Sequence, residues 1–414
     1  MSQQRPYDLI VIGGGAAGFF CAINAAQLNP ALKILIVEKS TKLLSKVKVS
    51  GGGRCNVTHH CFEPTPLSRH YPRGQKELKK LFRSFHAKDT VDWFSGLGVK
   101  LKTEEDGRMF PVSDDSQSII DCFLQQAHEF SIEIETGCEV EKIMIAENLF
   151  ELSFRNGNVL LSKNVVIAIG GHNYTEPYNF IRELGHQVTP TIPSLFTFND
   201  ADKDFKDLMG VAVQDAEVKI AGTKFSERGP VLITHWGLSG PAVIRLSSWA
   251  AEYLHQLKYE FTALVNWTGN RSEDELRKLL INQKGEHGKQ KIQTNAMFGL
   301  PSRLWEKLIT LSEIEPMKIW AESSNKDINR LVEFLIRCPF RIKGKTTFKE
   351  EFVSCGGVDL KEISLETMES AKLPGLYFAG EVLNIDGETG GFNFQAAWTT
   401  GWLAAQNIAH KTLK

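Results

Sequence analysis

The sequence predicts an α/β protein in which a parallel sheet with flanking helices is divided along the chain by an inserted segment. An apolar run at 9–12, a helix-like stretch at 16–28 and a second apolar run at 33–37 follow one another in the order of a βαβ unit. Further apolar runs at 165–169 and 376–379 have the composition of buried central strands. The composition of the chain changes between these two runs, so the first and last parts of the chain are expected to form one domain.

A glycine-rich turn joins the first strand to the first helix. Gly13, Gly15 and Gly18 fill the G-x-G-x-x-G frame, which allows a tight turn, close approach of a pyrophosphate and close helix packing. The helix directs its N-terminal amides and positive dipole end at the phosphates. Glu38 ends the second strand 20 residues after Gly18, where a carboxylate binds a ribose hydroxyl. The turn predicts a bound dinucleotide; a glycine-rich turn without a ligand is the alternative. The residues expected to contact the dinucleotide here are Gly13, Gly14, Gly15, Ala16, Ala17, Gly18, Glu38 and Lys39.

Composition limits the class of protein. A length of 414 residues predicts two or three domains. The formal net charge of −1 gives no electrostatic argument for binding nucleic acid or an anionic membrane. The seven cysteines form no C-x-x-C pair, and His59 and His60 have no partners at metal-ligand spacing, so no metal site is expected. Because no signal peptide or membrane span is evident, we expect a cytoplasmic protein that acts on a small molecule.

Periodicity predicts the remaining elements of the first domain. A polar, glycine-rich loop is expected at 40–56, and apolar spacing predicts helices at 75–96 and 116–130. The alternating segments that predict a small antiparallel meander are 139–145, 149–154 and 159–161.

The insertion begins after Pro190 and Pro193 and is expected to have a β-rich half and a helical half. The β-rich half, 194–266, has a short helix predicted at 239–254. The predicted helices of the second half are 274–283, 302–311 and 327–337, with an exposed loop at 284–291. A final helix is expected from about Gly390 to His410. The predicted domains are 1–192 plus 345–414, a β-rich insert at 193–268 plus about 338–344, and a helical part at 269–337.

Three further glycine-containing segments carry groups suited to a flat, anionic ligand. The loop from Lys46 to Asn56 has three consecutive glycines, which let the backbone approach a ligand closely. Gly380-Glu381 ends a strand and offers amides and a carboxylate. Two glycines, Gly390 and Gly391, open a helix whose positive end attracts negative charge. The residues singled out in these segments and after the strand at 165–169 are Lys46, Ser50, Gly51, Gly52, Arg54, Cys55, Asn56, Gly170, Gly171, Gly380, Glu381, Asp386, Gly391, Phe392 and Asn393.

Two residues have a structural explanation beside a chemical one. Cys55 suggests a redox role, but its nearest cysteine, Cys61, follows through an irregular loop, which favours a structural thiol. His235 lies in a tight turn before a helix, where histidine more often bonds to the backbone than acts as an acid or base.

Five motifs in one order resemble the BaiN-like group of FAD-dependent oxidoreductases, which includes aminoacetone-oxidase-type proteins. The motifs are GGGAAG, KVSGGGRCNVT, EDGRMFPVSDDS, THWGLSGPAVI and GLYFAGEVLNIDGETGGFNFQAA. The resemblance implies FAD, a Rossmann-like FAD-binding domain in two segments, an inserted β-barrel-like domain and a small helical domain. It also implies that Val140 meets the adenine and that the segment from Ser50 to Asn56 covers the isoalloxazine ring. One departure is Ser354-Cys355, where the family has a Thr or Ala-like residue before the glycines.

These observations lead to an FAD-dependent oxidoreductase that transfers a hydride through flavin N5. The chain has no second strand–G-x-G-x-x-G–helix unit, so NAD(P)H is expected only as a transient donor. The resemblance implies either enone reduction or amine oxidation. The alternatives are a flavin-carrying tRNA-modification factor and an FAD-binding protein without turnover. Arg54 and Asn393 are the candidate catalytic residues near the ring.

Overall fold

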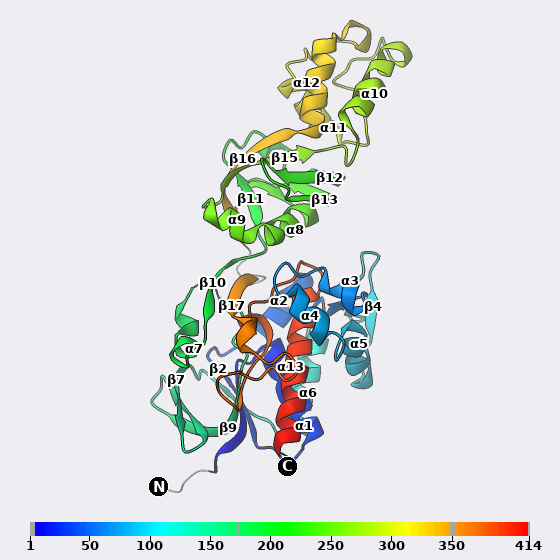
Figure 1. The fold of residues 1–414 in the computed structure, drawn as a ribbon. Coiled ribbons are helices and arrows are strands. Elements are labelled where there is room, and N and C mark those ends of the chain that lie inside the picture. The colour runs from blue at the N-terminus through cyan, green and yellow to red at the C-terminus, as the bar shows by residue number, and fades with distance from the viewer. Residues whose placement is uncertain (1–4, 173, 348–352, 413–414) are drawn as a thin grey trace. The chain divides into compact units, whose positions relative to one another are not determined.

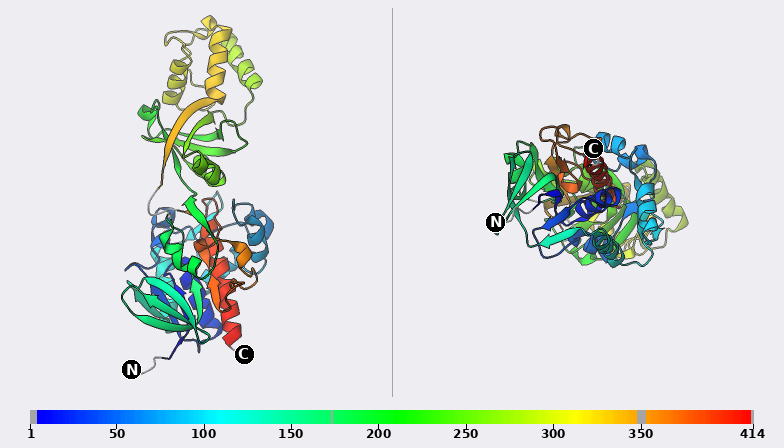
Figure 2. Two further views of the ribbon diagram at one scale, coloured as in Figure 1. Left: turned by 60° about the vertical axis from the view of Figure 1, so that its left-hand side comes forward. Right: turned by 90° about the horizontal axis from the view of Figure 1, so that it is seen from below.

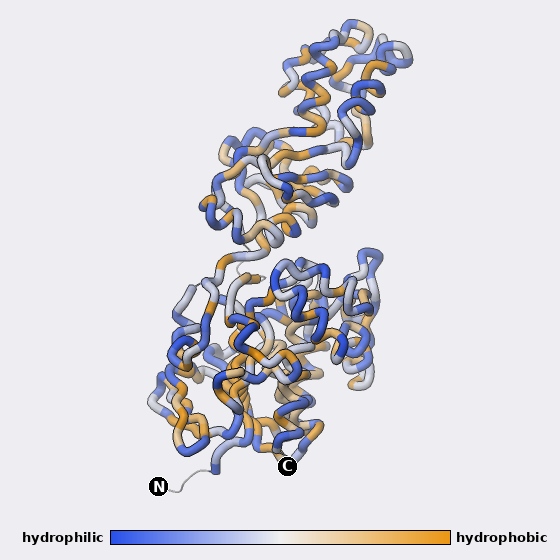
Figure 3. The backbone as a smooth tube through the Cα atoms, viewed as in Figure 1, coloured by the Kyte–Doolittle hydropathy of each residue, from blue (hydrophilic) through white to orange (hydrophobic). Residues whose placement is uncertain are grey.

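The computed structural model describes residues 5–172, 174–347 and 353–412 and divides the chain into two compact units (Figure 1). The first unit comprises Met1–Ser194 and Phe348–Lys414, and the second comprises Leu195–Thr347. The first unit therefore contains both ends of the chain. Apolar segments, drawn orange in Figure 3, occur throughout both units, and each unit has its own buried apolar core.

A seven-stranded sheet forms the centre of the first unit, with the order β6-β2-β1-β9-β8-β7 and with β18 also paired to β9. The strands β1, β2, β9 and β18 run parallel, and Val11 of β1 lies between Ile36 and Val166. The mixed α/β fold and the return of the C-terminal segment to the first sheet are thus as predicted. The strands are β1 (Tyr7–Ile12), β2 (Ile34–Glu38), β6 (Glu133–Thr136), β7 (Val140–Ala146), β8 (Leu149–Phe154), β9 (Val159–Ile167) and β18 (Leu376–Phe378).

The predicted meander is an extension of this sheet. The segments 159–161 and 165–169 were predicted as separate strands, but the structure joins them in β9, which pairs with β8 on one side and β1 on the other. The polar residues in the middle do not interrupt the strand because their side chains are satisfied: Ser162 Oγ donates to the Asn164 carbonyl (2.6 Å), and Asn164 Nδ2 donates to the Asp8 carbonyl (3.0 Å). Strand β7 ends the sheet on this side and pairs with β8 (Figure 2).

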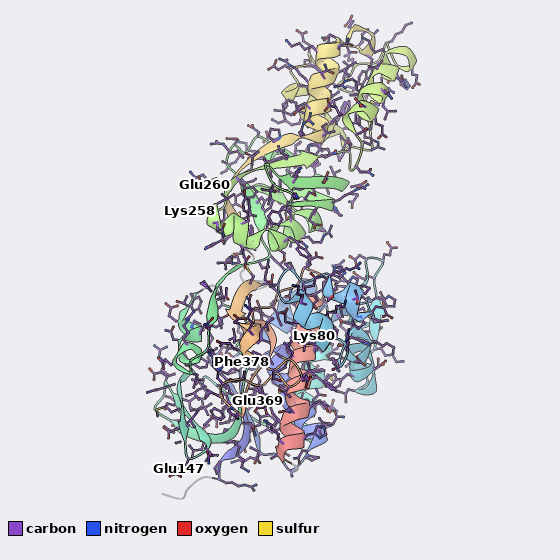
Figure 4. All side chains as sticks on the ribbon, in the orientation of Figure 1. Lys80, Glu147, Lys258, Glu260, Glu369 and Phe378 are labelled. Atoms are coloured by element: carbon purple, nitrogen blue, oxygen red, sulfur yellow. The ribbon has the colours of Figure 1, made fainter. Side chains whose placement is uncertain are left out.

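Two long helices, α1 and α13, pack side by side on this sheet (Figure 1). Gly401 of α13 faces the carbonyl of Ala17 so closely that an added Cβ would lie 2.9 Å from it. Helix α13 begins at Phe392, close to the predicted start near Gly390, because Gly390 and Gly391 have φ values of 135° and 90°. At the other end of α13, Glu369 (labelled in Figure 4) pairs with Lys411 and accepts the N–H of Gly375 just before β18.

Two predictions for the first unit were wrong in detail. The helix predicted at 75–96 is two helices, since His86 caps the second one by accepting the N–H of Lys88. The loop predicted at 40–56 contains a short helix, which loses helical geometry at Ser50–Gly52. The helices of the first unit are α1 (Ala16–Leu28), α2 (Ser45–Gly53), α3 (Pro64–Ser68), α4 (Gln75–Leu81), α5 (Ala87–Gly96), α6 (Gln117–Glu129), α7 (Asn179–Glu183) and α13 (Phe392–Thr412), with 3-10 turns η1 (Glu176–Tyr178), η4 (Leu360–Glu362) and η5 (Gly380–Val382). Its remaining strands are β3 (Thr58–His59), β4 (Leu101–Thr103), β5 (Arg108–Pro111), β10 (Val188–Pro193) and β17 (Ser354–Val358).

The second unit is a closed six-stranded barrel with helices that share its core. The helix predicted at 239–254 is a strand and two helices, and α10 continues to Glu286 into the predicted loop at 284–291. His235 lies in the turn in which the N–H of Thr234 donates to the Gly237 carbonyl. In order around the barrel the strands are β11 (Thr197–Asp200), β14 (Gly237–Ser239), β13 (Ser226–Ile233), β12 (Ala212–Ile220), β15 (Glu260–Asn266) and β16 (Cys338–Thr346). The helices are α8 (Pro241–Trp249), α9 (Ala251–Gln256), α10 (Glu273–Glu286), α11 (Ser302–Leu311) and α12 (Asn325–Ile336), with 3-10 turns η2 (Lys206–Leu208) and η3 (Trp320–Glu322).

Candidate functional site

The glycine turn after β1 leaves open space in front of α1. Gly13 has a φ of 117°, and an added Cβ would overlap the carbonyl of Ala168 after the adjacent strand β9. Gly18 is equally restricted, because its Cβ would overlap the Gly13 carbonyl. Gly15, the N-cap of α1, would by contrast meet no atom within 4 Å. The turn is therefore tight on its protein side and open where the helix presents its N–H groups to an anion.

The carboxylate of Glu38 holds this turn. Its Oε2 accepts the N–H of Gly14 and its Oε1 accepts the N–H of Ser40, both at 2.9 Å. The N–H of Cys138 donates to the Glu38 carbonyl at 2.9 Å, which brings the start of β7 at Val140 to the same end of the sheet. Lys39 is exposed beside it.

A second group of predicted residues meets at the ends of β9 and β18. The N–H of Gly380 donates to Thr400 Oγ1 of α13 at 2.9 Å. Glu381 Oε2 pairs with Lys46 Nζ at 2.5 Å, and its Oε1 accepts the N–H of Ser354 at 2.9 Å. A Cβ on Gly171, which follows Gly170, would overlap both Ser354 Oγ and the Glu381 carboxylate. Segments far apart in the sequence therefore converge on one carboxylate.

The loop after the three glycines is attached to the start of α13. With the Asn56 amide oriented to satisfy both neighbours, it accepts the N–H of Gly391 at 2.9 Å and donates to the Thr58 carbonyl at 3.1 Å. Thr58 Oγ1 donates to Gln395 Oε1 at 2.6 Å, and Trp398 Nε1 donates to the Val57 carbonyl at 2.9 Å. Gly51 and Gly52 have φ values of 59° and 69°, which only glycine adopts easily. Two motifs that the sequence separates by over 300 residues form one assembly.

The two candidate catalytic residues have structural partners. Arg54 pairs with Glu104 at 2.6 Å and Asp114 at 3.5 Å, and its guanidinium lies 4.0 Å from the centroid of the Phe110 ring. Asn393 accepts the N–H of Gly387 at 2.8 Å and donates back to the Gly387 carbonyl at 2.9 Å, which stabilises the turn before α13. These contacts give both residues a role in holding the loops.

Cys55 is fully buried, and burial raises its pKa to about 12. A thiol with that pKa is protonated at neutral pH, whereas a reactive cysteine is a thiolate. The structure therefore favours a structural thiol at this position. Cys355, in the segment that departs from the family pattern, is also buried in β17, while its neighbour Ser354 contacts Glu381.

A buried ion pair beside this assembly was not found from the sequence. Asp386 is fully buried and accepts hydrogen bonds from Arg73, with Nε to Oδ1 at 2.5 Å, and from Ser194 Oγ. Burial raises the pKa of Asp386, and the Arg73 guanidinium opposes that rise. Arg73 lies 313 residues from Asp386 in a segment without any local motif, so no pattern in the sequence indicated the pair.

The geometry fits an FAD molecule along the carboxyl ends of the parallel strands, where ligands of open α/β sheets bind. The open space at Gly15 faces the amides of a 13-residue helix, as a pyrophosphate requires. His172, just after Gly170-Gly171, has a buried Nε2 that has no hydrogen-bond partner within the described part of the chain. Such an orphaned polar atom is expected where a ligand completes the site.

Comparison with known proteins agrees with this geometry. The family described as "HI0933-like protein Rossmann domain" matches residues 7–407. The chain is 31% identical to the "Ribosomal RNA dihydrouridine synthase" of Escherichia coli K12, over 97% of this chain and 98% of that protein. It is 26% identical to the "3-dehydro-bile acid delta(4,6)-reductase" of Clostridium scindens, again over 97% and 98%. A 3-ketosteroid delta1-dehydrogenase from Sterolibacterium denitrificans has a similar fold, with a TM-score of 0.53, 14% identity and coverage of 99% of this chain and 100% of that one.

Proposed function

Because the chain belongs to the HI0933-like Rossmann family and is an FAD-dependent oxidoreductase, we propose that it reduces a carbon–carbon double bond conjugated to a carbonyl group. Formation of dihydrouridine saturates the C5=C6 bond of a uracil ring, which is conjugated to the C4 carbonyl. A delta(4,6)-reductase of a 3-dehydro bile acid acts on double bonds conjugated to the 3-oxo group. The names of two relatives that match nearly the whole chain thus share one electron-poor substrate group.

Bound FAD, once reduced by a donor such as NAD(P)H, would supply a hydride from N5 to the carbon β to the carbonyl, and a proton from water would add at the α carbon. The chain's own residues would bind the FAD and orient it. In this proposal the Gly13–Gly15 turn and the first turn of α1 hold the pyrophosphate, and Glu38 holds the adenosine ribose. Glu381 with Lys46 lies beside the ribityl chain. The N-terminus of α13, a 21-residue helix, favours negative charge on the reduced flavin.

The structural observation that supports a flavin in this proposal is the open space at Gly15 before α1, together with the close contact of Gly171 with Glu381 after β9 and β18. Two substrate classes remain in the proposal. A small conjugated ketone agrees with the net charge of −1, which gives no reason to expect binding to RNA. A uracil ring in ribosomal RNA is favoured by the 31% identity to the Escherichia coli protein.

The test is to photoreduce the protein without oxygen and to mix it with one acceptor at a time. The acceptors are a conjugated enone, the matching saturated ketone, and unmodified ribosomal RNA. We expect the flavin to reoxidise only with a conjugated acceptor, whose product gains two hydrogens by mass spectrometry. Reoxidation by oxygen alone, with flavin reduction by small amines, would refute the proposal and favour an amine oxidase. Anaerobic NADH and NADPH titrations test the proposed transient donor, and fractionation of cells tests the cytoplasmic location.

A further inference from the structure

His172 lies at the carboxyl end of β9, immediately after the Gly170-Gly171 pair. Its main-chain N–H donates to the hydroxyl of Tyr178 at 3.2 Å, and that hydroxyl donates to the Gly170 carbonyl at 3.4 Å. Tyr178 is fully buried, and the ring of Tyr174 lies 5.5 Å from the His172 ring. The backbone position of His172 is therefore fixed by a buried tyrosine.

One nitrogen of the His172 ring has no partner. Nε2 is buried, and within the described residues no donor or acceptor reaches it. The backbone of Ile169 acts on the ring in the sense that favours its protonated form, as a carbonyl oxygen beside a ring N–H does. Because Nε2 is the unpartnered nitrogen, the donor is Nδ1. A buried polar atom left unpaired costs free energy, so Nε2 is expected to meet a ligand atom.

The charges around the ring decide which kind of atom that is. Burial, Lys39 and Lys46 lower the pKa of His172 to about 4, so the imidazole is neutral at physiological pH. With Nδ1 carrying the only ring proton, Nε2 presents a lone pair and acts as an acceptor. A phosphate oxygen is also an acceptor and does not pair with it. The partner must be a donor such as a hydroxyl group.

Position then selects among the hydroxyls of FAD. Glu38 lies at the end of β2, where the adenosine ribose is proposed to bind. Lys39, beside Glu38, and Lys46 both act on the His172 ring, but the close contacts are at the other end, where Gly171 lies against Glu381, the partner of Lys46. This group, at the ends of β9 and β18, belongs to the ribityl end of the proposed site.

We propose that His172 Nε2 accepts a hydrogen bond from one hydroxyl of the FAD ribityl chain and so positions the flavin. The inference rests on the FAD site of the proposed function and assigns a residue that the sequence motifs did not identify. Because His172 would act through the cofactor, replacing it should change the affinity for FAD and the orientation of the flavin. It should not remove a group that takes part in the reaction.

The test uses the apoprotein and three FAD analogues that lack the 2′, 3′ or 4′ ribityl hydroxyl. Wild-type protein is expected to bind one of them about 3- to 10-fold more weakly than FAD, the effect of one neutral hydrogen bond. His172→Leu should bind FAD weaker by a similar factor and should lose the discrimination against that analogue. His172→Gln, which keeps an acceptor oxygen, should restore part of it. His128→Ala, an exposed histidine on α6, is the matched control and should behave as wild type.

Two outcomes would overturn the inference. One is a wild-type protein that binds all three analogues as tightly as FAD, a result that does not depend on the folding of any variant. The other is a His172→Leu protein that still discriminates as wild type does. Failure of the proposed function would look different. The protein would then bind FAD tightly, but its photoreduced form would reduce no conjugated acceptor.

Discussion

Replacement of Glu38 tests the adenosine end of the site most sharply. Its carboxylate accepts two backbone N–H groups, from Gly14 and Ser40, each at 2.9 Å. Glu38→Gln has one acceptor oxygen in place of two, so one of these N–H groups loses its partner. A hydrogen bond to a charged acceptor contributes about 1.5–3 kcal/mol. Loss of the ribose contact alone should therefore weaken FAD binding about 10- to 150-fold. Glu38→Ala should lose at least as much.

The assay is a fluorescence titration of apoprotein with FAD and, separately, with FMN, which lacks the adenosine half. FAD affinity should fall in both Glu38 variants. FMN affinity should change by less than about twofold, because FMN lacks the adenosine ribose to which Glu38 is proposed to bond. Glu141→Gln, at an exposed position on β7, is the control. An equal loss for FAD and FMN would show that Glu38 only shapes the turn, and unchanged FAD affinity would refute its role altogether.

Two further predictions concern stability. Asp386→Asn breaks a buried ion pair and should lower the free energy of unfolding by about 3–5 kcal/mol in urea titrations, whereas a double change of Arg73 and Asp386 to leucine should recover much of that loss; equal losses in both proteins would contradict this. Burial alone would lower the pKa of His70, but hydrogen bonds with Cys61 and Glu388 raise it to about 9 from an ordinary 6.5. The contribution of protonated His70 to the free energy of unfolding should be complete below pH 6.5 and should vanish as the pH rises through about 9. His70→Asn should flatten the dependence of the free energy of unfolding on pH over that range.

Local signals explain what the sequence predicted. The glycine frame at Gly13–Gly18 and the glycine pair Gly390-Gly391 mark the starts of α1 and α13 through residues a few positions away, so both helices could be predicted with nearly correct ends. The apolar composition of 376–379 predicted that this segment joins the first sheet, where β18 pairs with β9.

Long-range partners explain what the sequence did not predict. Arg54 pairs with Glu104, which lies 50 residues away beside another of the five motifs, and neither motif by itself shows that the two segments meet. The pairing of Arg73 with Asp386 depends on tertiary packing and leaves no periodic pattern. His172 is distinguished only by an unpaired nitrogen, which no sequence shows.

The most direct test of the proposed reaction is the rate at which photoreduced, oxygen-free protein is reoxidised by a conjugated enone or by uracil-containing ribosomal RNA in a stopped-flow instrument. We predict that the flavin absorption band returns with one of these acceptors and that the saturated analogue leaves it bleached. A band that stays bleached with every conjugated acceptor and returns only with oxygen would contradict the claim that this protein is a reductase of conjugated double bonds.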